Sequence, residues 1–124
     1  MRIAYVSGPY RANDIEGVQD NIYKARKIAI ELWKAGYAVI CPHTNTANFP
    51  GGAGEEKHGT IEYIKGDYEI ISIMRPNYDC IVMMPDWRTS EGARKELTAA
   101  INRGLIVYKW KEEKYKMLKN ACLA

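Results

Sequence analysis

The first 41 residues, MRIAYVSGPYRANDIEGVQDNIYKARKIAIELWKAGYAVIC, decide the fold class. Met1 to Ser7 is β-prone and stops at a Gly-Pro pair, a pattern typical of a strand followed by a turn. From Asp14 to Lys34, apolar residues recur at steps of three and four, which predicts an amphipathic helix. A glycine follows, and Tyr37 to Cys41 predicts a second strand. Strand, helix and strand in this order indicate the βαβ unit of a parallel sheet.

The rest of the chain continues the alternation of strands and helices. The predicted strand from Tyr78 to Met84 is a continuous apolar run, as expected when both faces of a sheet are covered. We therefore expect an α/β fold, a doubly wound, flavodoxin-like or Rossmann-like three-layer sandwich with four to five parallel strands, in one domain over residues 1–124. The further elements expected are helices at Thr60 to Met74, Ser90 to Arg103 and Glu112 to Ala121, and strands at Tyr78 to Met84 and Leu105 to Tyr108.

Composition narrows the class of protein. In 124 residues, 47% are hydrophobic and 27% are charged, which predicts one packed domain rather than a disordered chain. The net charge of +3 suits small anions, but it lacks the clustering of a dedicated nucleic-acid binder. No apolar run is long enough to span a bilayer, and no leader opens the chain. We expect a cytoplasmic protein that binds neither nucleic acid nor membrane.

Cysteine and histidine spacing gives no sign of a metal site or a disulfide framework. Cys41, Cys80 and Cys122 stand far apart and are odd in number. His43 and His58 do not form a recognisable ligand pair. We expect reduced, mostly buried cysteines, no structural metal and no cofactor.

A long stretch without periodicity, Pro42 to Gly59, predicts a loop. Its centre, Pro50 to Gly54, resembles the opening of the P-G-G-x-G-T-x-x-E signature of cytokinin-activating nucleotide phosphoribohydrolases. Glu55 replaces the threonine of that signature, and His58 replaces its glutamate. We interpret the segment as a flexible lid over a pocket.

The loop after the first strand is a candidate ligand site, because ligands of doubly wound sheets bind beyond the carboxyl ends of the strands. Ser7 offers a hydroxyl, and Gly8 lets a ligand approach the backbone. Arg11 stands just before a helix, whose amino end favours anions. The loop could hold a phosphate or a sugar, or it could be a tight turn that joins strand to helix.

The segment from Asp86 to Glu96 is a second candidate. Ser90 is a plausible N-cap, and Gly92 leaves the first helical turn uncovered, so that its free N–H groups could meet an anion. Glu96 lies further into the helix, where side chains tilt back toward the amino end and into the same crevice. The alternative is an ordinary solvated helix charge.

Further carboxylates occur at Asp67 and Glu69. Two carboxylates across a crevice can divide the cleavage of a glycosidic bond between them. One attacks or stabilises the sugar carbon, and the other handles the proton of the leaving group. Charges of this kind also occur on any helix surface, so the alternative is a solvated face.

These pieces together resemble the nucleoside 2-deoxyribosyltransferase superfamily, including its 2′-deoxynucleoside 5′-phosphate N-hydrolase branch. The matching stretches are IAYVSGPYRA, YIKGDYEII and DCIVMMPDWRTSEGARKELTAAINRGLIVY. The most specific part is the S-x-G-A-x-x-E core at Ser90, Gly92, Ala93 and Glu96. The resemblance extends from Ile3 to about Tyr108.

The resemblance implies roles for individual residues. Glu96 would attack the anomeric carbon, Asp67 would serve the departing base as proton donor or hydrogen-bond partner, and Tyr5 would position the nucleophile or the sugar. The spacing from Asp67 to the next strand is longer than in the family, as if Met74 to Asn77 were inserted, which leaves Glu69 as an alternative for the role of Asp67. The implied phosphate-binding residues are Ser7, Gly8, Arg11, Ser90 and Gly92, and the two candidate segments add Pro9, Tyr10, Asp86 and Trp87 to the expected substrate-binding residues.

The expected function is cleavage of, or transfer across, the N-glycosidic bond of a (deoxy)nucleoside 5′-monophosphate. The resemblance also implies a homodimer or higher homo-oligomer. One alternative is a nucleotide-binding or sensing module that has the same fold and no turnover. Another is an interaction protein, because nine tyrosines could supply a surface for a partner.

Overall fold

Four parallel strands form the sheet of the computed structural model, which describes residues 1–47 and 60–120. Their spatial order is β2-β1-β3-β4, so β1 and β3 are central. This order and the helices on both faces make a flavodoxin-like three-layer fold, as predicted, with four strands in the described residues. The strands are β1 (Ile3–Ser7), β2 (Ala38–Ile40), β3 (Cys80–Met83) and β4 (Ile106–Lys109).

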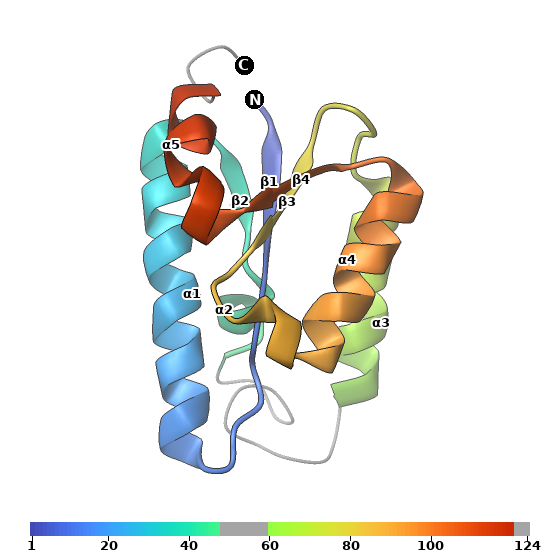
Figure 1. The fold of residues 1–124 in the computed structure, drawn as a ribbon. Coiled ribbons are helices and arrows are strands. Elements are labelled where there is room, and N and C mark those ends of the chain that lie inside the picture. Colours follow the sequence, from blue (N-terminus) through green and yellow to red (C-terminus); the bar gives the residue numbers. More distant parts are fainter. Residues whose placement is uncertain (48–59, 121–124) are drawn as a thin grey trace.

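The helices lie in two layers, with α1 and α5 on one side of the sheet and α3 and α4 on the other (Figure 1). All of the predicted helices form, with ends that differ by up to two residues. The helices are α1 (Ile15–Ala35), α2 (Pro42–Asn45), α3 (Thr60–Ile73), α4 (Glu91–Arg103) and α5 (Trp110–Asn120), with a 3₁₀ turn, η1, at Trp87–Thr89.

The short helix α2 corrects the prediction of a loop from Pro42 onward. Proline suits the first turn of a helix, because its fixed φ is already helical and its missing N–H would have no partner there. Residues 48–59 of the predicted loop, including Pro50 to Gly54 and His58, lie outside the described residues.

Local signals in the sequence fix where the long helices begin and end. The Asp14 side chain accepts a hydrogen bond from the backbone N–H of Gly17 at 2.7 Å and starts α1. Ser90 accepts one from the N–H of Ala93 at 3.1 Å, which confirms it as the N-cap of α4. The left-handed conformation of Gly36, with φ of 106°, ends α1.

The two faces of β1 face different parts of the core. Ala4 and Val6 point toward α1 and α5, whereas Tyr5 points toward α3 and α4. Alternate side chains of a strand point to opposite faces, so Ser7 lies on the same face as Tyr5. Both hydroxyls are therefore directed toward α4.

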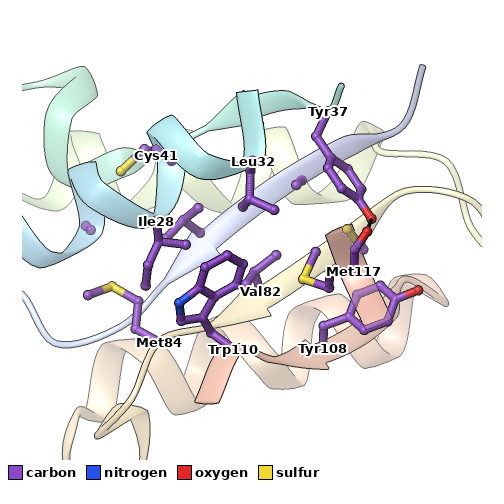
Figure 2. Close-up of a cluster of buried hydrophobic side chains, with 14 residues drawn as sticks. Ile28, Leu32, Tyr37, Cys41, Val82, Met84, Tyr108, Trp110 and Met117 are labelled. Atoms are coloured by element: carbon purple, nitrogen blue, oxygen red, sulfur yellow. Dashed lines mark hydrogen bonds between the residues drawn. The ribbon is translucent and has the colours of Figure 1, made fainter. Parts of the chain in front are cut away.

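The larger of the two core clusters joins α1, the sheet and α5 (Figure 2). Leu32 of α1 and Trp110 of α5 pack over the strand residue Val82. The hydroxyl of the buried Tyr37 donates to the carbonyl of Met117 at 2.8 Å, which satisfies the polar atom inside the cluster. Cys41 and Cys80 are buried and free, as predicted, whereas Cys122 lies outside the described residues.

The amino edge of the sheet is closed by Asp79, which is fully buried. Its carboxylate accepts hydrogen bonds from the N–H of Ile3 at 2.8 Å, from the N–H of Arg75 at 2.7 Å, and from two guanidinium nitrogens of Arg75 at 3.0 and 2.8 Å. Residues 74–77, which are predicted to be an insertion relative to the family, therefore form a turn that is stabilised by the hydrogen bonds from Arg75 to Asp79.

No described helix has the length and apolar character needed to cross a membrane.

Candidate active site

A cavity of about 510 Å³ lies at the carboxyl edge of the sheet, within the size range of small-molecule sites. The loop after β1, the start of α2, and helices α3 and α4 all contribute to its wall. The residues that line it are Gly8, Pro9, Tyr10, Arg11, Pro42, His43, Thr46, Tyr63, Ile64, Asp67, Tyr68, Thr89, Ser90, Glu91, Gly92, Ala93, Lys95 and Glu96.

Glu96 stands at the point where the cavity meets the sheet. The Tyr5 hydroxyl donates a hydrogen bond to its Oε2, and the Ser7 hydroxyl donates one to its Oε1 at 2.7 Å. Because Tyr5 and Ser7 are two residues apart on one face of β1, the strand presents both hydroxyls to one carboxylate. Tyr5 and Ser7 do not line the cavity. Both are fully buried and bind the Glu96 carboxylate from the side of the sheet.

Burial dominates the ionisation of this group. It raises the pKa of Glu96 above its usual range, although the hydrogen bonds from Tyr5 and Ser7 favour the charged form and oppose the shift. Burial and the nearby Glu96 charge also raise the pKa of Tyr5, so this phenol stays protonated and donates. Glu96 is therefore fixed in orientation by two hydroxyls and has no cation as a partner among the described residues.

Asp67 of α3 faces the same cavity. The pKa of Asp67 is raised to about 7, mainly by burial and to a smaller extent by repulsion from Glu96. A large fraction of Asp67 is therefore protonated at neutral pH and able to donate. Glu69 is exposed and does not line the cavity, so of the two carboxylates considered from the sequence only Asp67 shares a cavity with Glu96.

The amino end of α4 forms another part of the wall. Ser90, Gly92 and Ala93 line the cavity, and a Cβ on Gly92 would meet only Ser90 Oγ at 3.9 Å, so nothing packs against this glycine. Free N–H groups and the helix dipole favour an anion at such a terminus. Arg11 adds a positive charge to the wall, whereas Lys95 pairs with Glu91 at 3.0 Å.

Gly8 in the loop after β1 has a packing role. A Cβ at this position would lie 2.5 to 2.8 Å from the side chain of Met84, which is closer than atoms can approach. The loop can pass over the end of β3 only because this residue has no side chain.

Three predicted binding residues do not line the cavity: Ser7, whose buried hydroxyl binds Glu96 rather than a ligand, Asp86 and Trp87. Asp86 and Trp87 line a neighbouring hollow of about 210 Å³, together with Arg88, whose guanidinium sits 4.8 Å from the Trp87 ring. Thr89 lines both spaces. All other predicted catalytic and binding residues either line the cavity or hold Glu96.

Several residues that line the cavity carry no signal in the sequence pattern. His43 of α2 is only 5% exposed, and its Nε2 lies 2.8 Å from the carbonyl oxygen of Pro9. Burial lowers the pKa of His43, so the ring is neutral near pH 7. Tyr63 and Tyr68 add aromatic wall from α3. In residues 1–47 and 60–120, no group of three or more His, Cys, Asp or Glu could hold a metal ion.

Comparison with known proteins identifies the family. A search of curated proteins found no match. Residues 2–109 match a family model described as "Domain of unknown function (DUF4406)", and this range includes all four strands and every residue of the cavity wall. The match spans most of the chain, which therefore belongs to the DUF4406 family.

Proposed function

We propose that this protein cleaves, or transfers across, the N-glycosidic bond of a (deoxy)nucleoside 5′-monophosphate. The observation that carries the proposal is the pairing of Glu96, held by Tyr5 and Ser7, with Asp67, whose pKa is raised to about 7. Carboxyl groups with different environments in one cavity suit the division into nucleophile and acid. The resemblance to nucleoside 2-deoxyribosyltransferases supports the same assignment.

In the proposed reaction, a carboxylate oxygen of Glu96 attacks the anomeric carbon and forms a glycosyl ester. The bond from that carbon to the base nitrogen breaks, and its electron pair remains on the base, which takes the Asp67 proton. Water or a second base then attacks the anomeric carbon and releases Glu96. The attacking water or base gives up its proton to Asp67, which is thereby restored. Tyr5 and Ser7 keep the carboxylate aligned in both steps.

The amino end of α4 and Arg11 support a substrate that carries a 5′-phosphate. A helix terminus with unshielded N–H groups favours a dianion. We place this reaction in the cytoplasm.

A second copy of the chain is the proposed partner. Ile61 and Ile64 of α3 are 65% and 42% exposed, and Ile64 also lines the cavity, so an apolar surface continues into the cavity wall. A homodimer through this surface would enclose the substrate further. Sedimentation of the wild type and of Ile61→Asp tests this. A wild type that is monomeric at micromolar concentration contradicts it.

The activity is tested by incubating the protein with ribo- and deoxyribonucleoside 5′-monophosphates and measuring free base by chromatography. Release by the wild type, no release by Glu96→Ala, and unchanged release by the control Glu69→Gln are expected, because Glu69 does not line the cavity. Mass spectrometry after a rapid acid quench should find the sugar on Glu96, and an added acceptor base distinguishes transfer from hydrolysis.

Failure to release base from any nucleotide contradicts the proposal. If nucleotides raise the melting temperature without forming product, the protein is a nucleotide-binding module.

A further inference from the structure

Three successive carbonyls of the loop after β1 accept hydrogen bonds from side chains outside the loop. His43 Nε2 lies 2.8 Å from the oxygen of Pro9. The single side-chain nitrogen of Asn21, on α1, lies 3.1 Å from the oxygen of Tyr10 and 3.4 Å from that of Arg11. The loop is thus held from α1 on one side and from α2 on the other.

The chemistry of the partners fixes which atoms donate. Carbonyl oxygens only accept, so Asn21 must present its NH₂ group, whose two hydrogens serve the two carbonyls. His43 likewise carries its proton on Nε2, and burial keeps the ring neutral. Its Nδ1 is buried and has no hydrogen-bond partner in the described part of the chain. The Tyr10 ring also packs edge-on against His43, with centroids 5.8 Å apart.

The direction of the carbonyls determines the direction of the amides. In a trans peptide, C=O and N–H point in opposite directions. The carbonyls of Tyr10 and Arg11 both point at Asn21, so the next two N–H groups, those of Arg11 and Ala12, both point away from it. Neither N–H has an acceptor among residues 1–47 and 60–120. Two successive N–H groups without acceptors, in a loop that lines the cavity, can donate together to the oxygens of one anion.

We propose that Asn21 and His43 are positioning residues, which turn the carbonyls of residues 9–11 away from the ligand so that the loop presents N–H groups to a phosphate. Neither residue needs to touch the substrate. This inference takes from the proposed function only that the ligand carries a phosphate. Its test does not require turnover.

Ribose 5-phosphate is the probe, because it has the sugar and the phosphate but no base to release. We expect the wild type to bind it in calorimetry, and the ¹⁵N–¹H signals of Arg11 and Ala12 to shift on binding. Asn21→Asp keeps the size of the side chain but cannot donate, and Asn21→Leu removes the donor without adding charge. Both should weaken binding about tenfold or more. The control Gln19→Glu, which adds the same charge as Asn21→Asp two residues away on α1, should change binding less than about twofold.

His43 supplies a rescue experiment. His43→Leu removes the donor to Pro9 and should weaken ribose 5-phosphate binding about fivefold. His43→Gln can still donate a side-chain N–H and should restore most of the affinity. In the active enzyme, Asn21 variants should raise KM for a nucleotide while kcat stays within about twofold, because Asn21 does not reach Glu96.

The outcomes separate the two proposals. If Asn21→Asp and Asn21→Leu bind ribose 5-phosphate as tightly as the wild type, or if the wild type does not bind it, the positioning role is wrong, whether or not nucleotides are cleaved. If the wild type binds ribose 5-phosphate, loses this binding in the Asn21 variants and cleaves no nucleotide, then the positioning role holds and the proposed reaction fails.

Discussion

Asp79 and Glu96 are carboxylates at opposite ends of one sheet, and their surroundings differ. Asp79 receives four hydrogen bonds, two of them from the Arg75 guanidinium, whereas Glu96 receives two from neutral hydroxyls. Burial alone would raise both pKa values. The bonds from Arg75 and Ile3 reverse this for Asp79 and lower its pKa, whereas the pKa of Glu96 remains raised. A carboxylate that is fully satisfied holds the fold, and one that is held but not neutralised is available for chemistry.

The largest effect is expected from removing the satisfied carboxylate. Asp79→Ala leaves the N–H groups of Ile3 and Arg75 without their acceptor where the sheet begins. We expect a loss of about 3 kcal/mol in the free energy of unfolding, toward the lower end for broken buried pairs because Arg75 is half-exposed. Urea denaturation measures it. A variant as stable as the wild type would show that Asp79 is not what closes the amino edge.

The next effect concerns the hydroxyl that holds Glu96. Tyr5→Phe removes the donor to Oε2, so the charged form of Glu96 loses stabilisation and its pKa rises further. We expect kcat/KM to fall about tenfold, which corresponds to ~1.4 kcal/mol, and the acidic limb of the pH profile to move to higher pH. The matched control is Tyr37→Phe, which removes a buried hydroxyl bond on the other face of the sheet. The control should lose stability and keep the pH profile, and equal profiles in both variants would refute the role of Tyr5.

A smaller effect on folding is expected at Glu96 itself. Glu96→Gln removes a buried charge that has no cationic partner in the described residues, and a Gln oxygen can still accept from one hydroxyl. The free energy of unfolding should therefore change by less than about 1 kcal/mol at neutral pH, in contrast with Asp79→Ala. Denaturation of the two variants side by side tests the comparison. Equal destabilisation would remove the distinction between the two ends of the sheet.

A further effect is the pH dependence of stability contributed by Asp67. As pH rises from about 4 to 7, the unfolded chain ionises Asp67 first, because its pKa in the fold is raised to about 7, and the fold loses stability relative to the unfolded chain. Asp67→Asn should therefore gain stability relative to the wild type across this window, with a constant difference above it. Asp79 acts in the opposite direction: because its pKa is lowered in the fold, the stability it contributes is present above its ordinary pKa of 3.8, declines as pH falls below that value, and is lost once pH has fallen through the lowered pKa. Thermal melts from pH 2 to 9 test both signs.

Much of the fold could be predicted because its signals are local. The apolar steps of α1, the caps Asp14 and Ser90, and the apolar run at β3 all act within a few residues. The position of Glu96 in the cavity also followed from the tilt of side chains toward the amino end of a helix.

What the sequence did not reveal depends on contacts between distant elements. Asn21 on α1 has the pattern of an ordinary helix residue, and only the packed fold brings it to the carbonyls of the loop after β1. Pro9, the partner of His43, lies 34 positions away along the chain, and Ile3, one of the two residues that bind Asp79, lies 76 positions away. Asp86 and Trp87 were expected in the cavity because of their neighbours in sequence, but Asp86 has a positive φ of 66°, and both residues line the neighbouring hollow instead.

The short strand β1 also sets a rule for insertions and deletions in this family. Tyr5 and Ser7 reach Glu96 only while both are in phase with the pleat of the sheet. One residue gained or lost between Ile3 and Tyr5 would turn Ala4 or Val6 toward α4 and bury two hydroxyls beneath α1. Length changes within this strand are therefore tolerated only in twos, so that alignments of homologues should show no single-residue gap there.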